Sequence, residues 1–339
     1  MERTKTILRL LAGVVALAAA PVRAQAPTDW TEAVVSVRDP VAATRLFREE
    51  GGWRISGKGR MSAGEKVYWR LPQTAGARFV RICAPAATAG CIRFVQFTGV
   101  AQRPIRLAAR PWDTGGIFSI MIRSNDVQGL FDRAIAMGWW AESEPIAFDF
   151  LGSDLRNVVL SGPDGINIAA YERKSPPFTA FPVGRMSQGF NAMRFVRDER
   201  ASVVFYRDKL GFNPVFDTDN LDPVPTTSNF SIPKNLTPTI IRRAAALRPG
   251  SSEAGRVEAM QLVGLDGRDF SQFASPPNLG ILSLRYPITD LSAYRAKLTA
   301  GGVAIAYESK AVPVPGLGKI DLFAVRDPDG NITEFYQTH

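Results

Sequence analysis

The strongest constraint on the fold is an internal duplication. Residues 34–53 (VVSVRDPVAATRLFREEGGW) align with residues 193–212 (MRFVRDERASVVFYRDKLGF), which places Asp39 on Asp198 and Gly52 on Gly211. Further along, SIMIRSNDVQGLFDRAIAMG aligns with SLRYPITDLSAYRAKLTAGG, and SGPDGINIAAYE aligns with RDPDGNITEFYQ. The matches occur in the same order in both halves. The chain therefore consists of two related halves, and the similarity is not limited to isolated motifs.

Each half contains a second, weaker repeat. A short strand-like run ends in Asp, an amphipathic segment follows, and a Gly such as Gly211 stands where a helix ends with positive φ. Two or three further strand-like runs come next. The pattern predicts an α+β fold of four βαβββ modules in two tandem domains, residues 28–175 and 188–339. A Pro- and Gly-rich segment, residues 173–190, joins them.

The motifs FVRDERASVVFYRDKLGF and DPDGNITEFYQ resemble the opening and closing signatures of the vicinal oxygen chelate superfamily. That superfamily includes glyoxalase I, bleomycin-resistance proteins and extradiol dioxygenases, and the resemblance covers nearly all of the chain after its N-terminal segment. It implies that each pair of modules forms a cupped mixed sheet around one cavity. A divalent metal typically lies there, held by His or Gln on first strands and by Glu on last strands.

The resemblance assigns eight positions to these ligand sites. They are Glu32, Gln96, Ser119 and Ala169 in the first domain, and Asn191, Gln261, Ser283 and Glu334 in the second. Neither set contains His, because the only His is the C-terminal His339. One carboxylate with amides and a hydroxyl is a weak ligand set for iron, nickel or zinc, although Mg²⁺ or Ca²⁺ tolerates it better. We therefore expect no metal and no other cofactor, with a divalent ion at Glu334 as the open alternative, and we exclude an extradiol dioxygenase.

Side chains alternate along a strand, so residues two positions from these sites face the same cavity. In the second domain this adds Met193, Phe195, Arg285 and Tyr336. Apolar walls with a few convergent polar groups are typical of a small-molecule site. We expect a small organic ligand to bind there, in contact with Asn191, Gln261, Ser283, Phe195 and Met193. The first domain reads as a degenerate copy.

Two alternatives stay open. In the first, the protein is a metal-independent lyase, isomerase or epimerase in which Glu334 is a general base and Arg285 or Tyr336 holds an oxyanion. In the second, Arg285 and Glu334 pair with each other, and the chain is a non-catalytic scaffold.

The N-terminal segment indicates export. Residues 1–24 combine basic residues, an apolar run and a small-residue cleavage site, which predicts a signal peptide and a periplasmic or secreted protein with no membrane association after cleavage. Cleavage would lower the net charge from +9 to about +6, because four basic groups and one acidic group leave. The remaining Lys and Arg form no long run, so we expect no nucleic-acid partner. The oligomeric state stays open.

The chain has two cysteines, in RICAPAATAGCIRF. Cys83 and Cys91 flank a turn-rich segment between two strand-like runs. They can form a disulfide across this hairpin in an oxidising compartment, or they can be two small buried apolar residues.

Overall fold

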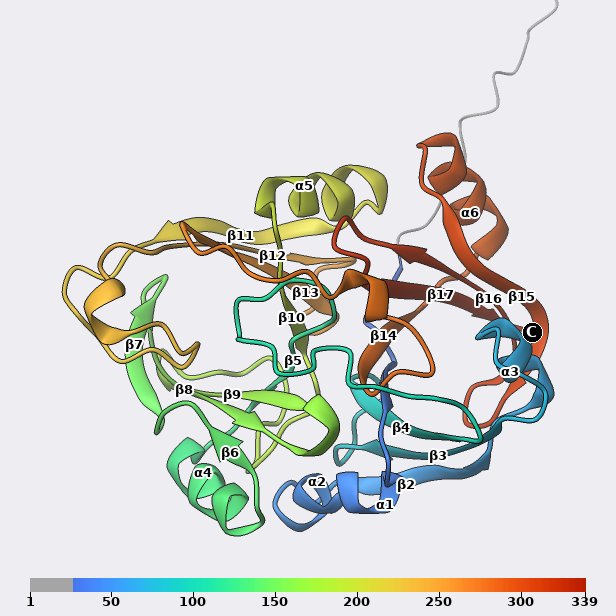
Figure 1. The fold of residues 1–339 in the computed structure, drawn as a ribbon, viewed down its shortest axis with the longest axis horizontal. Helices are drawn as coiled ribbons and strands as arrows, with labels where there is room; N and C mark the ends of the chain where they lie inside the picture. The colour runs from blue at the N-terminus through green and yellow to red at the C-terminus, as the bar shows by residue number, and fades with distance from the viewer. Residues whose placement is uncertain (1–26) are drawn as a thin grey trace, which may run out of the picture.

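The computed structural model describes residues 27–339, which form two strongly curved sheets lying side by side (Figure 1). The predicted α+β class is confirmed, and the four predicted modules are present. Among the described residues, no helix is long and apolar enough to cross a membrane. The predicted signal peptide lies outside the described residues, so it and the export it implies remain predictions.

The elements follow one another module by module. Module 1 contains β1 (Glu32–Ser36), α1 (Pro40–Ala43), α2 (Arg45–Glu49), β2 (Arg54–Arg60), α3 (Ala63–Tyr68), β3 (Gly76–Cys83) and β4 (Cys91–Thr98). Module 2 contains β5 (Ser119–Arg123), α4 (Val127–Ala136), β6 (Trp140–Ala141), β7 (Ile146–Phe150), β8 (Ser153–Ser161) and β9 (Asn167–Ser175). Module 3 contains β10 (Asn191–Phe195), α5 (Glu199–Val204) with a π-helical turn (Phe205–Lys209), β11 (Asn213–Asn220), β12 (Ile241–Arg248) and β13 (Arg256–Val263). Module 4 contains β14 (Gly280–Pro287), α6 (Leu291–Ala300), β15 (Ile305–Val314), β16 (Gly318–Arg326) and β17 (Ile332–Thr338).

The repeated Asp and Gly residues set the limits of the first helical segment in every module. Each repeated Asp is an N-cap, and its carboxylate accepts a hydrogen bond from a backbone N–H of the first turn; the four are Asp39, Asp126, Asp198 and Asp290. Each repeated Gly follows the helical segment with φ between +65° and +87°, a conformation that other residues adopt only under strain; the four are Gly52, Gly138, Gly211 and Gly302. The sequence repeat therefore marks helix boundaries.

The modules do not pair in the order in which they follow one another. Strand β1 pairs antiparallel with β14, so modules 1 and 4 share one sheet, which we call the β14 sheet. Its strand order is β15-β16-β17-β14-β1-β4-β3-β2. Strand β5 pairs with β10, so modules 2 and 3 share the other, the β10 sheet, with the order β11-β12-β13-β10-β5-β9-β8-β6 and β7 on β8.

This pairing differs from the prediction of consecutive pairs. Each of the two segments, 28–175 and 188–339, contributes one of its modules to the β14 sheet and the other to the β10 sheet. The predicted boundaries do fall between strands, because β9 ends at Ser175 and β10 begins at Asn191. Each curved sheet is nevertheless built from both halves of the chain, which changes the set of residues that face each cavity.

Buried apolar side chains form three clusters. The largest lies between the convex faces of both sheets and the helices, and it includes Phe47, Leu130, Tyr206 and Tyr294. A second cluster fills the concave face of the β14 sheet, and a third lines the concave face of the β10 sheet. One continuous core thus packs the helices against the convex faces of both sheets, and each concave face has a separate apolar cluster.

Cys83 and Cys91 form a disulfide between the end of β3 and the start of β4, with Cα atoms 4.4 Å apart. Of the two alternatives for these cysteines, the structure contains the disulfide. It closes the hairpin loop next to Gly90, whose carbonyl accepts a hydrogen bond of 3.0 Å from the backbone N–H of Gly189. Gly189 lies two residues before β10, the strand that starts module 3, so this bond links the two halves of the chain.

Candidate functional site

The concave face of the β10 sheet encloses a cavity of about 740 Å³. Residues of β7–β9 and of β11–β13 line it, and these strands lie in the left half of Figure 1. Its apolar wall includes Met121, Phe148, Phe190, Phe216, Phe230 and Met260. Its polar side chains include Arg123, Tyr171, Asn191, Arg256 and Glu258. The volume is in the range of small-molecule sites in proteins.

Glu258 is the most buried carboxylate of this lining, with 8% of its surface exposed. It lies on β13 directly beside Met193 of β10, and its Oε2 atom accepts a hydrogen bond of 2.8 Å from Nδ2 of Asn191. Burial raises the pKa of Glu258 to about 7, because the hydrogen bond from Asn191 and the charge of Arg256 only partly offset the loss of water. Near neutral pH this side chain therefore exchanges between the acid and the carboxylate.

Replacing Glu258 by Gln should change how stability depends on pH. Between pH 4.5 and 7 the unfolded wild type ionises at this residue while the folded protein stays protonated, so folding loses stability as the pH rises through the folded pKa. Gln accepts the same hydrogen bond without ionising. We expect Glu258→Gln to match the wild type near pH 4 and to exceed it by about 3 kcal/mol at pH 8.5. Urea unfolding at both pH values measures this. A difference independent of pH would contradict the raised pKa.

The structure divides the predicted site residues between the two sheets. Asn191 lines the cavity of the β10 sheet, and Met193 and Phe195 belong to the apolar cluster on the same concave face. Ser119 and Ala169, assigned to the other domain from the sequence, are on this sheet too. Ser283, Arg285, Glu334 and Tyr336 are on the β14 sheet. The predicted set is therefore not one site.

The predicted orientation of Gln261 is wrong. Its Oε1 atom accepts a hydrogen bond of 3.2 Å from the backbone N–H of Glu199, at the start of α5, on the convex side of the sheet. Gln96, its counterpart on β4, likewise bonds to the carbonyl of Arg38 next to α1. The cavity-facing residue is Glu258, three positions before Gln261 and therefore on the opposite face of the strand. The signal that could have found it is its place beside β10, which matches the place of Glu334 beside β14.

On the β14 sheet, Glu334 and Arg285 are fully buried and bonded to each other, with 3.1 Å between Oε2 and Nε. Ser283 also donates a hydrogen bond to Glu334, and the Tyr336 hydroxyl donates to Oγ1 of Thr31 at 3.1 Å. This arrangement matches the alternative in which Arg285 and Glu334 pair with each other. The predicted general base, Glu334, and one predicted oxyanion holder, Arg285, thus pair with each other, and the other, Tyr336, is hydrogen-bonded to Thr31.

Glu32 is the centre of this buried ion cluster. Its carboxylate lies 2.7 Å from Nε of Arg81, 2.7 Å from Nε of Arg93 and 2.9 Å from Nη1 of Arg285. Burial alone would raise the pKa of Glu32, but Arg93 and Arg285 outweigh it and lower the pKa to about 2. Glu65 lies 4.0 Å from Arg285, so three carboxylates face three guanidinium groups. The concave face of the β14 sheet is thus occupied by its own charged and aromatic side chains.

The residues at the inferred ligand positions do not fit a transition metal. On the β14 sheet, Arg93 occupies the last-strand position of module 1, and its guanidinium bonds to Glu32. On the β10 sheet, Ala169 has no donor atom, and Glu258 supplies one carboxylate beside Ser119 and Asn191. Within residues 27–339, no three His, Cys, Asp or Glu side chains form a group that could hold a metal ion.

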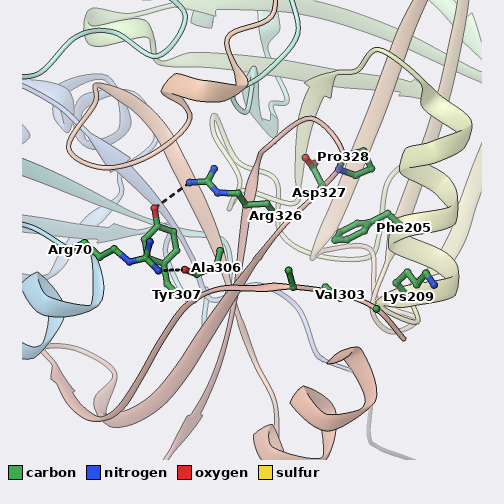
Figure 2. A pocket seen from close by; sticks show the side chains of 11 residues that line it. Arg70, Phe205, Lys209, Val303, Ala306, Tyr307, Arg326, Asp327 and Pro328 are labelled. Atoms are coloured by element: carbon green, nitrogen blue, oxygen red, sulfur yellow. Dashed lines mark hydrogen bonds between the residues drawn. The ribbon is translucent and has the colours of Figure 1, made fainter. Parts of the chain in front are cut away.

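A second, more open hollow of about 510 Å³ is lined by residues of modules 1, 3 and 4 (Figure 2). Its basic side chains are already bonded. Arg70 donates to the carbonyl of Ala306 at 2.7 Å, Arg326 donates to the Tyr307 hydroxyl at 3.2 Å, and Lys209 donates to the carbonyl of Gly301 at 2.9 Å. Since these cations are bonded within the chain, the hollow is the weaker candidate for a ligand site.

The comparison with family sequences agrees with this architecture. Residues 190–335 match the model of the Glyoxalase/Bleomycin resistance protein/Dioxygenase superfamily. This segment is a domain of that superfamily. The match runs from the start of β10 to β17, so it covers modules 3 and 4, which belong to different sheets. No curated protein matches the chain.

Solved structures share the fold over most of the chain. Glyoxalase I from Zea mays superposes with a TM-score of 0.62 at 15% sequence identity, covering 91% of this chain and 92% of that one. A putative dioxygenase from Bacillus subtilis subsp. subtilis str. 168 gives a TM-score of 0.56 at 10% identity, covering 93% of this chain and 86% of that one. At these identities the likeness establishes the fold alone.

Proposed function

We propose that the protein binds a small organic molecule in the cavity of the β10 sheet. The observation that carries this proposal is the cavity itself, about 740 Å³ with apolar walls and convergent polar side chains. The β14 sheet provides the contrast that supports this choice. Its own concave face is filled by the ion cluster around Glu32, whereas the concave face of the β10 sheet has a cavity.

Binding can be tested with a neutral fluorescent probe, N-phenyl-1-naphthylamine (NPN), whose emission rises in apolar surroundings. Ala244 of β12 lines the cavity and is 3% exposed, so the indole of Ala244→Trp would extend into the space a ligand needs. We expect one NPN molecule to bind the wild type and affinity to fall at least about tenfold in Ala244→Trp, since most of the apolar contact is lost.

The matched control is Ala306→Trp, which places the same side chain in the hollow of Figure 2. It should leave NPN binding unchanged. Loss of binding in Ala306→Trp but not in Ala244→Trp would move the site to that hollow, and absence of NPN binding by the folded wild type would refute the proposal.

Catalysis by proton transfer is the second candidate, and the observation that favours it is Glu258. A carboxylate with a pKa of about 7 inside a cavity is suited to accept and return a proton at neutral pH. We therefore propose Glu258, rather than Glu334, as the general base of the lyase, isomerase or epimerase alternative. In D₂O, the wild type should then exchange a carbon-bound hydrogen of a cavity-bound carbonyl fragment, followed by NMR, and Glu258→Gln should not. No exchange with fragments shown to bind would remove this candidate.

A further inference from the structure

One end of the β10-sheet cavity gathers three arginines. Arg123 of β5, Arg173 of β9 and Arg256 of β13 all contribute to its lining. The guanidinium carbons of Arg123 and Arg256 lie 4.7 Å and 6.0 Å from the centre of the same ring, Phe190. Arg173 follows two residues after Tyr171, the neighbour of Arg123 across the β5–β9 pair. The three groups therefore belong to one region of the wall.

These arginines are poorly supplied with partners. Among residues 27–339, the Nε atoms of all three are buried and without a hydrogen-bond partner. Within the same part of the chain, Arg123 and Arg173 take part in no ion pair, and Arg256 shares Glu253 with Arg248. Arg123 is 9% exposed and its guanidinium lies 4.0 Å from the ring centre of Phe178. Burial and the nearby charges of Arg256 and Arg173 lower the pKa of Arg123 to about 10, and the opposing charge of Glu253 offsets this only in part.

The remaining carboxylates of the lining do not balance this charge. Asp222 is held by Arg242 through two bonds of 2.6 Å, and exposed Asp149 accepts a hydrogen bond from the backbone N–H of Gly152. Glu258 accepts from Asn191 and is partly protonated at neutral pH. Buried donors without acceptors cost free energy unless a ligand supplies the acceptors.

We propose that the ligand of this cavity is an organic anion, with its carboxylate, sulfonate or similar group bound by Arg123, Arg173 and Arg256 and its apolar body against the aromatic wall. This rests on the proposed function and adds the class of ligand. Guanidinium groups bind planar anions through paired N–H donors, and aromatic side chains hold the apolar part.

The test compares NPN with 8-anilinonaphthalene-1-sulfonate (ANS), which has the same ring system with a sulfonate added. We expect ANS to bind the wild type about ten- to hundredfold more tightly than NPN, the gain typical of charge-assisted hydrogen bonds. Arg123→Met should lower the affinity for ANS about tenfold and change the affinity for NPN by no more than about threefold. Arg243→Met is the matched control: it removes the same charge from β12, but its side chain pairs with Asp219 outside the lining, so both affinities should stay unchanged.

The outcomes separate the two proposals. If NPN binds and ANS binds no more tightly, the anion proposal is wrong and the binding function stands. If neither probe binds, both are wrong. Arg173→Met, at a half-buried position, is prepared alongside in case Arg123→Met does not fold. An ANS preference that survives in Arg173→Met would then overturn the proposal, and its loss with NPN binding retained would support it.

Discussion

Glu32→Gln should destabilise the protein by about 3–5 kcal/mol at pH 7, the usual cost of removing one partner from a buried ion pair. Gln keeps the shape of Glu32 but leaves Arg81, Arg93 and Arg285 with one carboxylate fewer. For a chain of this size the loss corresponds to a fall in Tm of roughly 10 °C. Urea or thermal unfolding of the two proteins measures it.

The same variant has a defined pH dependence. The folded pKa of Glu32 is about 2, below its ordinary value of 4.5, so its stabilising contribution is complete above pH 4.5 and is lost as the pH falls towards 2. The difference between wild type and Glu32→Gln should therefore shrink at pH 3. Glu49→Gln is the control, since Glu49 pairs with Arg45 at an exposed site and its loss should cost less than about 0.5 kcal/mol. A Glu32→Gln protein within 1 kcal/mol of the wild type at pH 7 would contradict the described cluster.

Gly90→Ala is expected to lower the free energy of unfolding by about 3 kcal/mol, because it disturbs the contact between Gly90 and Gly189 that links the two halves of the chain. Gly90 has φ of +70°, and an added Cβ would lie 2.1 Å from the carbonyl oxygen of Gly189. Left-handed backbone costs about 1 kcal/mol for Ala, and separating two packed backbone segments costs a further 1–3 kcal/mol. Thermal unfolding of the variant gives the sum.

Gly52→Ala isolates the contact from the backbone strain. Gly52 has a similar φ of +65°, but no atom lies within 4 Å of an added Cβ. The Gly52→Ala protein should therefore lose only about 1 kcal/mol of unfolding free energy. Equal losses in the two variants would mean that the approach of Gly90 to Gly189 contributes nothing to stability.

Local features of the fold could be predicted from the sequence because they depend on neighbouring residues. The N-cap role of Asp198 and the positive φ of Gly211 follow from residue type and spacing, and they recur in all four modules. The pairing of β1 with β14 could not be predicted this way. All four first strands carry similar apolar patterns, so the pattern does not choose between partners about 90 and about 250 residues away.

For the same reason, only part of the candidate site could be predicted from the sequence. Asn191, Met193 and Phe195 are on one strand, so their common face follows from alternation alone. Glu258 was missed because no turn motif fixes the register of β13, and an odd shift exchanges the two faces of a strand. Glu334 follows from its motif, but the motif does not reveal that its partner Arg285 also pairs with Glu32, which in turn pairs with Arg93.

The nested pairing of the modules has a consequence for biosynthesis. As the chain leaves the ribosome, the strands of modules 2 and 3 are complete once residue 263 has emerged, whereas β1 lacks its partner β14 until residue 287 has emerged. During that interval module 1 presents the open hydrogen-bonding edge of β1. Segments in this state are prone to aggregate or to pair with another copy, so truncated chains that stop before module 4 should be the natural clients of holdase chaperones.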